Sequence, residues 1–136
     1  MSVLKSKRDE SIIEFINTAR ELNMHTIRQC VKFPKRYTFF VNQDIVALSN
    51  EIYEDSVKAN AINPSNQHEA QARKDLLIAA YTNCESLVAK IALAKELFPI
   101  EERHMIRWME FISKEQRLLK GAIKHDEERY KSLPTT

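Results

Sequence analysis

The side chains that could bind a metal ion are four histidines and the carboxylates near them. A di-iron site in a helix bundle needs two Glu-x-x-His motifs and two further carboxylates that face inward. The sequence has one such motif, Glu101 to His104, at the expected start of a helix, where acidic residues also favour the helix dipole. Since His25, His68 and His125 have no carboxylate three residues before them, we expect no metal site.

Catalysis by cysteine needs a thiol that lies beside a base and is open to solvent. His25 lies five residues before Cys30, off its helical face, and Cys84 lies on an apolar helix stripe. The one glycine of the chain, Gly121, also excludes the glycine-rich loops that bind phosphate groups in nucleotide-dependent enzymes. We therefore expect no catalytic residues and no cofactor, and a protein that is not an enzyme.

The two cysteines are expected to remain free thiols. Cys30 falls near the end of the first expected helix, whereas Cys84 falls near the middle of the third, about 14 residues before that helix reaches the same end. At about 1.5 Å per residue they lie roughly 18 Å apart along the axis, well beyond the roughly 7 Å limit for bridged Cα atoms. Two buried thiols in a reducing compartment are therefore expected.

Lysine and arginine side chains give the main indication of a binding function. If the helices alternate in direction, the first and third turns share one end of the bundle and gather a basic set there: Arg28, Lys32, Lys35, Arg36, Lys95, Arg103 and Arg107. These side chains could contact phosphate groups. However, Glu96, Glu101 and Glu102 share that end, the opposite end has basic residues of its own, and the net charge is only +2. An ordinary solvated surface therefore remains the alternative.

The elements that must position these residues are expected to be helices. The 136 residues include one glycine and four prolines, which leaves little of the turn chemistry that β-proteins need. Hydrophobic residues make up 43% and charged residues 29%, as in a folded domain with one core. The start is basic without the apolar segment of a secretion signal, and no stretch approaches about 18 uncharged apolar residues. We expect a cytoplasmic protein that does not cross a membrane.

Apolar residues return at three- and four-residue steps in four segments, which is the spacing of helices with one buried face. Breaks are expected at Phe33-Pro34, Asn63-Pro64 and Phe98-Pro99, because proline has no N–H and disfavours helical geometry in the residue before it. The predicted helices run from about Asp9 to Val31, Arg36 to Ala61, after Asn66 to Phe98, and after Pro99 to Tyr130. Their short connections predict an all-α, up-down-up-down four-helix bundle in one domain, residues 1–136, with flexible ends at 1–8 and 132–136.

Each predicted helix has an inward apolar stripe. In the first helix we expect it to hold Ile12, Phe15, Ile16, Ala19, Leu22, Ile27 and Val31, and in the second Tyr37, Phe40, Val41, Ile45, Leu48, Ile52 and Val57. Asn66 and Glu69 have the spacing of a capping box for the third helix. Trp108 in the fourth helix is expected to fill the core, with an anchor in a protein interface as the alternative.

Four segments of the chain resemble a known family. They are the basic Phe-Pro turn at 32–40 (KFPKRYTFF), the Asn- and Ala-containing turn at 58–61 (KANA), the helical run 87–97 (LVAKIALAKEL) and the run 117–121 (RLLKG). The family is a bacterial group of four-helix bundles. It includes the proteins encoded in intervening sequences of 23S rRNA genes and the accessory variability determinants of diversity-generating retroelements.

The resemblance implies a homo-oligomer, commonly a pentamer with a central channel, that acts by binding. For the retroelement branch it implies contact with nucleic acid and a reverse transcriptase through a basic surface. By matching position, the implied contacts are Lys32, Lys35, Arg36 and Arg117, to which the basic set adds Arg28. The chain lacks the Gly-Gly-Trp sequence often seen in the last helix of that branch.

Together with the resemblance, the sequence predicts a non-enzymatic, oligomeric helix-bundle module that binds nucleic acid or a nucleic-acid enzyme such as a reverse transcriptase, and the resemblance implies that it is carried on a mobile element. The candidate nucleic-acid contacts are Arg28, Lys32, Lys35, Arg36 and Arg117. The alternative is a protein-interaction or structural scaffold that acts through an apolar helix face without nucleic acid.

Overall fold

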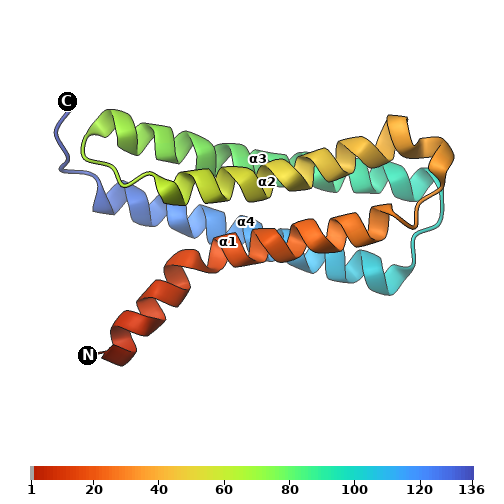
Figure 1. Cartoon of the computed structure of the whole chain (residues 1–136), viewed down its shortest axis with the longest axis horizontal. Coiled ribbons are helices and arrows are strands. Elements are labelled where there is room, and N and C mark those ends of the chain that lie inside the picture. Colours follow the sequence, from red (N-terminus) through yellow and green to blue (C-terminus); the bar gives the residue numbers. More distant parts are fainter. Residues whose placement is uncertain (1) are drawn as a thin grey trace.

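The predicted all-α architecture is confirmed. The structure, a computed structural model, describes residues 2–136, with side chains described from Ile13 onward. Its four helices are α1 (Ser2–Cys30), α2 (Gln43–Ala61), α3 (Gln67–Leu97) and α4 (Glu102–Arg129) (Figure 1). Because α1 begins at Ser2, the predicted start near Asp9 is wrong. The side chains of residues 1–12 lie outside the described part, and with them the inward place predicted for Ile12 and the flexibility predicted for residues 1–8.

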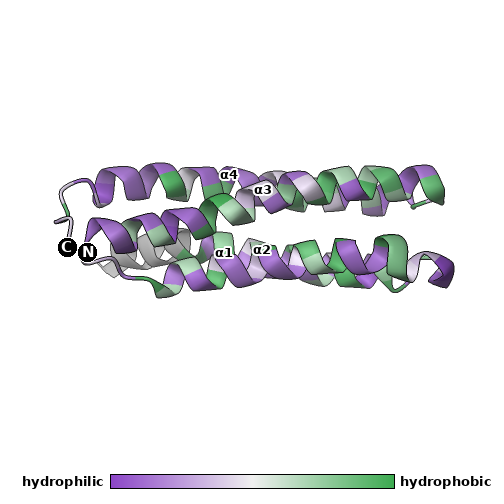
Figure 2. Ribbon diagram, turned by 90° about the horizontal axis from the view of Figure 1, so that it is seen from above, coloured by the Kyte–Doolittle hydropathy of each residue, from purple (hydrophilic) through white to green (hydrophobic). Residues whose placement is uncertain are grey.

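The helices form an up-down-up-down bundle in which each packs against its neighbours in the chain and α4 returns to α1. The turn from α1 to α2 and the turn from α3 to α4 therefore lie at one end (Figure 1). We call this the two-turn end. The α2–α3 turn and the C-terminus lie at the opposite end. In Figure 2 hydrophobic and hydrophilic residues alternate along the helices, and hydrophobic residues are frequent near the two-turn end.

The segment after Pro34 is not the regular helix that was predicted from Arg36. It forms a 3-10 turn, η1 (Lys35–Tyr37), and then a π-helical turn, η2 (Thr38–Asn42), before α2 begins at Gln43. The wider winding of a π turn changes which side chains face inward. Val41 and Asn42 are buried, whereas Phe39 and Phe40 are each 76% exposed. The predicted inward place of Phe40 is therefore wrong.

Small polar residues take core positions that the predicted stripes gave to larger apolar ones. Ile27, Val31 and Val57 are exposed, while Thr26, Ser49 and Ser56 are fully buried. The hydroxyls of Thr26 and Ser56 donate to the carbonyls of Leu22 (2.8 Å) and Ile52 (2.7 Å), one turn earlier in the same helix. Because both bonds lie within one helix, the hydroxyls keep a hydrogen-bond partner even when they face the core. Thr26, Ser49 and Ser56 therefore occupy inward positions, and Ile27, Val31 and Val57 face outward.

The third and fourth helices match their predictions more closely. The Asn66 side chain accepts a hydrogen bond from the Glu69 N–H at 2.8 Å, as predicted for the helix cap. Helical spacing predicts an apolar face of eight residues for α3. Tyr81 and Val88 are half-buried, and the other six are buried: Leu77, Ala80, Cys84, Leu87, Ile91 and Ala94. Trp108 of α4 is fully buried, which confirms the core placement and removes it as an interface anchor. Cys30 and Cys84 are buried free thiols, as predicted.

A buried ion pair ties three helices together at the end opposite the two turns. Arg73 Nε of α3 lies 2.6 Å from Asp126 Oδ2 of α4, and Arg73 Nη1 donates to the Ala59 carbonyl at the end of α2 at 2.9 Å. The C-terminal tail, for which flexibility was predicted, is attached here as well. The Gln67 N–H donates to the Pro134 carbonyl at 2.8 Å, and the Gln67 side chain donates to the Leu133 carbonyl at 2.9 Å.

Among the described residues, α3 is the helix that is long and apolar enough to cross a membrane. The core helix of a globular bundle passes the same test, because it too must be apolar along its length. In α3 the fully buried residues Leu77, Leu87 and Ile91 pack within the bundle core. Of the apolar window in α3, 28% is buried inside the bundle, so packing against α2 and α4 accounts for part of its apolar composition.

Candidate functional site

Four of the five predicted nucleic-acid contacts come together at the two-turn end. Arg28 lies in the last turn of α1, Lys32 follows α1, and Lys35 and Arg36 belong to η1. All four side chains are exposed. None of them belongs to an ion pair within the part of the chain that the structure describes. They therefore present their charges to solvent.

One further cation, Arg107 of α4, extends this surface. Lys32 and Arg107 both lie near the His25 ring, and the Arg107 guanidinium also lies 5.1 Å from the centre of the Phe111 ring. The pKa of His25 is lowered, chiefly because the ring is buried and further because Arg107 and Lys32 disfavour a third positive charge. A neutral His25 therefore sits beneath a positively charged rim.

The acidic residues at this end are partly neutralised by other partners. Glu101 pairs with Arg103 at 2.8 Å and with His104 at 3.1 Å, and Asp44 pairs with Lys90 at 3.3 Å. Two acids at this end belong to none of the described ion pairs, Glu96 and Glu102. Six cations at this end also belong to none of them: Arg28, Lys32, Lys35, Arg36, Lys95 and Arg107. The local charge is therefore positive although the net charge of the chain is only +2.

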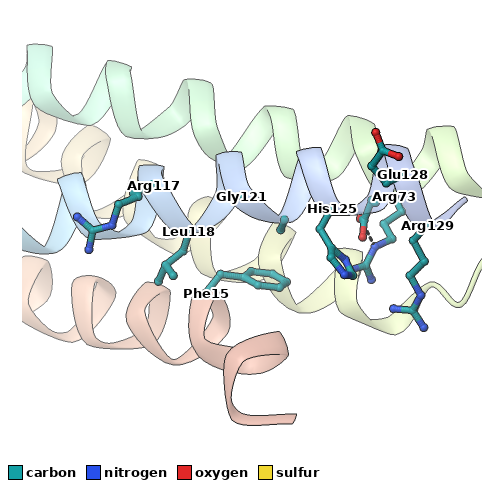
Figure 3. Close-up of a pocket in the computed structure, with 10 residues that line it drawn as sticks. Phe15, Arg73, Arg117, Leu118, Gly121, His125, Glu128 and Arg129 are labelled. Carbon is teal, nitrogen blue, oxygen red and sulfur yellow. Dashed lines mark hydrogen bonds and ion pairs between the residues drawn. The ribbon is translucent and has the colours of Figure 1, made fainter. Parts of the chain in front are cut away.

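Arg117, the fifth predicted contact, lies elsewhere. Its side chain is exposed on α4 and lines a cavity of about 880 Å³ together with Phe15, Gly121 and Arg129. Figure 3 shows Arg117 at one side of this cavity and Arg129 at the other. Ten residues of helix, or about 15 Å, separate Arg117 from Arg107 along α4. The structure thus separates Arg117 from the surface that holds the other four contacts.

Exposed apolar side chains lie next to the cations. Phe39 and Phe40 are each 76% exposed and Val31 is 75% exposed, the highest values among the large apolar residues that the structure describes. A groove of about 470 Å³ between the end of α1 and the start of α2 is lined by Val31 and by Thr38 and Asn42, which belong to the same π turn as the two phenylalanines. Sequence reasoning missed this surface because it placed Phe40 and Val31 in the core.

The core also contains a carboxyl group that sequence reasoning missed. Glu115 of α4 is 0% exposed, and burial raises its pKa to about 9. Its Oε2 lies 3.4 Å from Ser56 Oγ of α2, and its Oε1 has no partner among the described residues. Helical spacing could have identified it, because the apolar residues Trp108, Ile112 and Leu119 define an inward face on which position 115 also lies.

The buried thiols are poorly suited to catalysis. Burial raises the pKa of Cys30 to about 12 and raises that of Cys84 further, so neither forms the reactive thiolate at neutral pH. In the described part of the chain, no group of three or more His, Cys, Asp or Glu side chains could hold a metal ion. The feature that remains for a functional interpretation is the exposed basic and apolar surface of the two-turn end.

Comparison with protein-family models, with curated proteins and with solved structures gave no match to this chain.

Proposed function

We propose that the chain is a non-enzymatic nucleic-acid-binding module that contacts phosphate groups through the two-turn end. One observation carries the proposal. Four exposed cations lie between positions 28 and 36, and none of them belongs to an ion pair among the described residues: Arg28, Lys32, Lys35 and Arg36. Since cations that contact phosphates release counterions from the nucleic acid, such binding weakens as salt rises.

The salt dependence gives the first test. With about four phosphate contacts, the logarithm of the affinity should fall against the logarithm of salt with a slope of roughly −3 to −4. We expect the variant Lys32→Gln, Lys35→Gln, Arg36→Gln to bind more weakly on every nucleic-acid sequence, with a slope shallower by roughly 2 to 3. Fluorescence anisotropy of labelled DNA and RNA over a salt series measures both quantities.

A matched control exists at the other end of the bundle. Lys120, Lys124 and Lys131 are exposed and lie outside the described ion pairs, so their replacement by Gln removes the same charge from a different surface. The control variant should keep the wild-type slope. No binding at low ionic strength, or an affinity that stays constant as salt rises, would reject phosphate contact by this surface.

The family resemblance extends the proposal to the cellular setting. It favours a cytoplasmic protein carried on a mobile element, with a reverse transcriptase as the enzyme partner and a homo-oligomer, commonly a pentamer, as the functional form. A reverse transcriptase gene with template repeats beside the gene for this chain would support the retroelement setting. A neighbourhood without them would leave the binding proposal standing on the basic surface.

A second candidate function is self-association or scaffolding through the apolar surface of Val31, Phe39 and Phe40. It is favoured by the exposure of these three side chains, because large exposed apolar patches mark interaction sites. We expect wild-type protein to be oligomeric and the variant Phe39→Ser, Phe40→Ser to have a lower mass in light scattering. Since both rings are exposed, the variant should keep its helical circular dichroism.

Val57→Ser is the control for this second candidate, because Val57 is a partly exposed apolar residue near the other end of α2. It should leave the mass unchanged. A wild-type protein that is monomeric at high concentration, or a double variant with the wild-type mass, would exclude this surface as the contact between copies.

A further inference from the structure

The groove at the two-turn end has the composition of a small-ligand site. Its volume of about 470 Å³ falls in the range of roughly 300–1,000 Å³ that such sites occupy. The α1 side of the groove is apolar, with Ile27, Val31 and Phe33. The η2–α2 side combines the polar residues Thr38, Asn42 and Gln43 with the apolar residues Val46 and Ala47. Lys35, which also lines the groove, adds a positive charge.

Asn42 is the unusual residue of this groove. It is buried, its Nδ2 reaches the Pro34 carbonyl only at 3.4 Å, and its Oδ1 has no partner within the described chain. A buried amide oxygen without a partner is costly, and natural proteins seldom leave one. The π turn is what places it there, because η2 turns both Val41 and Asn42 inward at consecutive positions. A π turn at such a place is frequently associated with function.

The surroundings of the groove select the class of ligand. Phe39 and Phe40, in the same turn as Asn42, are 76% exposed and offer flat faces. Lys32, Lys35 and Arg36 lie around them without acidic partners in the described ion pairs. Exposed aromatic rings combined with cations are typical of surfaces that bind single strands, where bases stack on the rings and phosphates contact the cations.

We propose that the groove between α1 and α2 receives one unpaired base of a single-stranded nucleic acid, with the Asn42 carboxamide meeting the edge of the base. A carboxamide offers both a donor and an acceptor, which matches the edges of the bases. A duplex must first unstack and unpair a base before the base can enter the groove, whereas a single strand avoids this cost, so the groove favours single strands. This inference rests on the proposed nucleic-acid binding and adds the strand preference and the residues that cause it.

The test compares a short labelled single strand with its duplex at the same salt concentration. Wild-type protein should bind the single strand more tightly than the duplex. The variants Asn42→Ala and Phe39→Ser, Phe40→Ser should each lose roughly ten- to a hundred-fold in affinity for the single strand. Their salt slope should stay at the wild-type value, because no cation is removed.

The double phenylalanine variant keeps the test valid if Asn42→Ala fails to fold, since both rings lie on the surface. Salt-dependent binding without any strand preference would overturn the inference and leave the proposed function intact. Absence of binding to every nucleic acid would overturn both. Wild-type affinity in the double variant, together with a lower mass in solution, would overturn the inference and assign the apolar surface to contact with a second copy.

Discussion

Replacing Trp108 with alanine is expected to lower the free energy of unfolding by about 3–5 kcal/mol. The indole is fully buried, and its Nε1 donates to Thr26 Oγ1 of α1 at 2.9 Å. Its ring also lies 5.8 Å from the His25 ring and 6.2 Å from the Phe33 ring, measured between centroids. The substitution would leave a cavity between α1 and α4 and remove the partner of a buried hydroxyl.

Urea unfolding followed by circular dichroism measures this loss, because the variant has no tryptophan fluorescence to follow. Trp108→Phe should lose less, since a six-membered ring remains and the loss is limited to the pyrrole part of the indole with its N–H. Ile106→Ala, two residues away but exposed, should change stability by no more than about 0.5 kcal/mol. A Trp108→Ala variant with wild-type stability and an altered mass in solution would mean that Trp108 anchors an interface.

Glu115 is expected to make the bundle less stable as the pH rises. Its pKa is about 9 in the folded protein because burial disfavours the charged form, against 4.5 for an ordinary glutamate. Between these two values the folded state holds a proton that the unfolded state has released. The free energy of unfolding therefore falls by about 1.4 kcal/mol for each unit of pH. The stabilisation is complete below pH 4.5 and is lost as the pH rises toward 9.

The geometry agrees with a protonated carboxyl at neutral pH. The hydroxyl of Ser56 lies 2.7 Å from the Ile52 carbonyl, to which it donates, and 3.4 Å from Glu115 Oε2. Because its one proton is shared with the nearer carbonyl, it stabilises a charged carboxylate less than burial destabilises it. An ionised Glu115 would find no cation in this part of the core, because none of the described ion pairs includes it. An unpaired buried charge is strongly destabilising.

The matched variant is Glu115→Gln, which has nearly the same shape and cannot ionise. From pH 7 to pH 8.5 the wild type should lose about 2 kcal/mol of stability that Glu115→Gln keeps. In this range the lowered pKa of His25 contributes little, since that histidine is neutral in both states. Glu110→Gln, an exposed position on the same helix, should follow the wild type. Parallel pH profiles for wild type and Glu115→Gln would show that Glu115 does not govern this dependence.

The sequence was a good guide to α3 and a poor one to the start of α2. In α3 the inward positions from Leu77 to Ala94 are apolar, so periodicity alone identifies Leu77 and Ile91 as buried. The buried Arg73 is the exception, and its pairing with Asp126 of α4 could not be read from the spacing. After Pro34, the number of residues per turn depends on how the segment packs, and no local pattern distinguishes a π turn from an α-helix. The exposure of Phe39 and Phe40 follows from that turn and was therefore missed.

The candidate site was predictable in part. The turn positions of the prolines and the alternating direction of the helices together predict that Arg28, Lys32, Lys35 and Arg36 share one end. The sequence does not show that these four cations lack ion-pair partners, because this depends on Glu101 pairing with Arg103 and on Asp44 pairing with Lys90. The first pair joins neighbours in one turn and is a local feature of the sequence. The second joins α2 to α3, and a linear pattern does not contain the distance between side chains of two helices.

By itself, the order of residues determined four helices, their breaks at prolines and their antiparallel sequence, because backbone geometry and apolar spacing are local properties. Only the tertiary structure decided that Glu115 lies in the core, that Asn42 keeps an unpartnered oxygen beside a groove, and that two phenylalanines face solvent. The physical reason is that burial, pairing and pKa depend on which side chains from distant segments meet, and that is set when the helices pack.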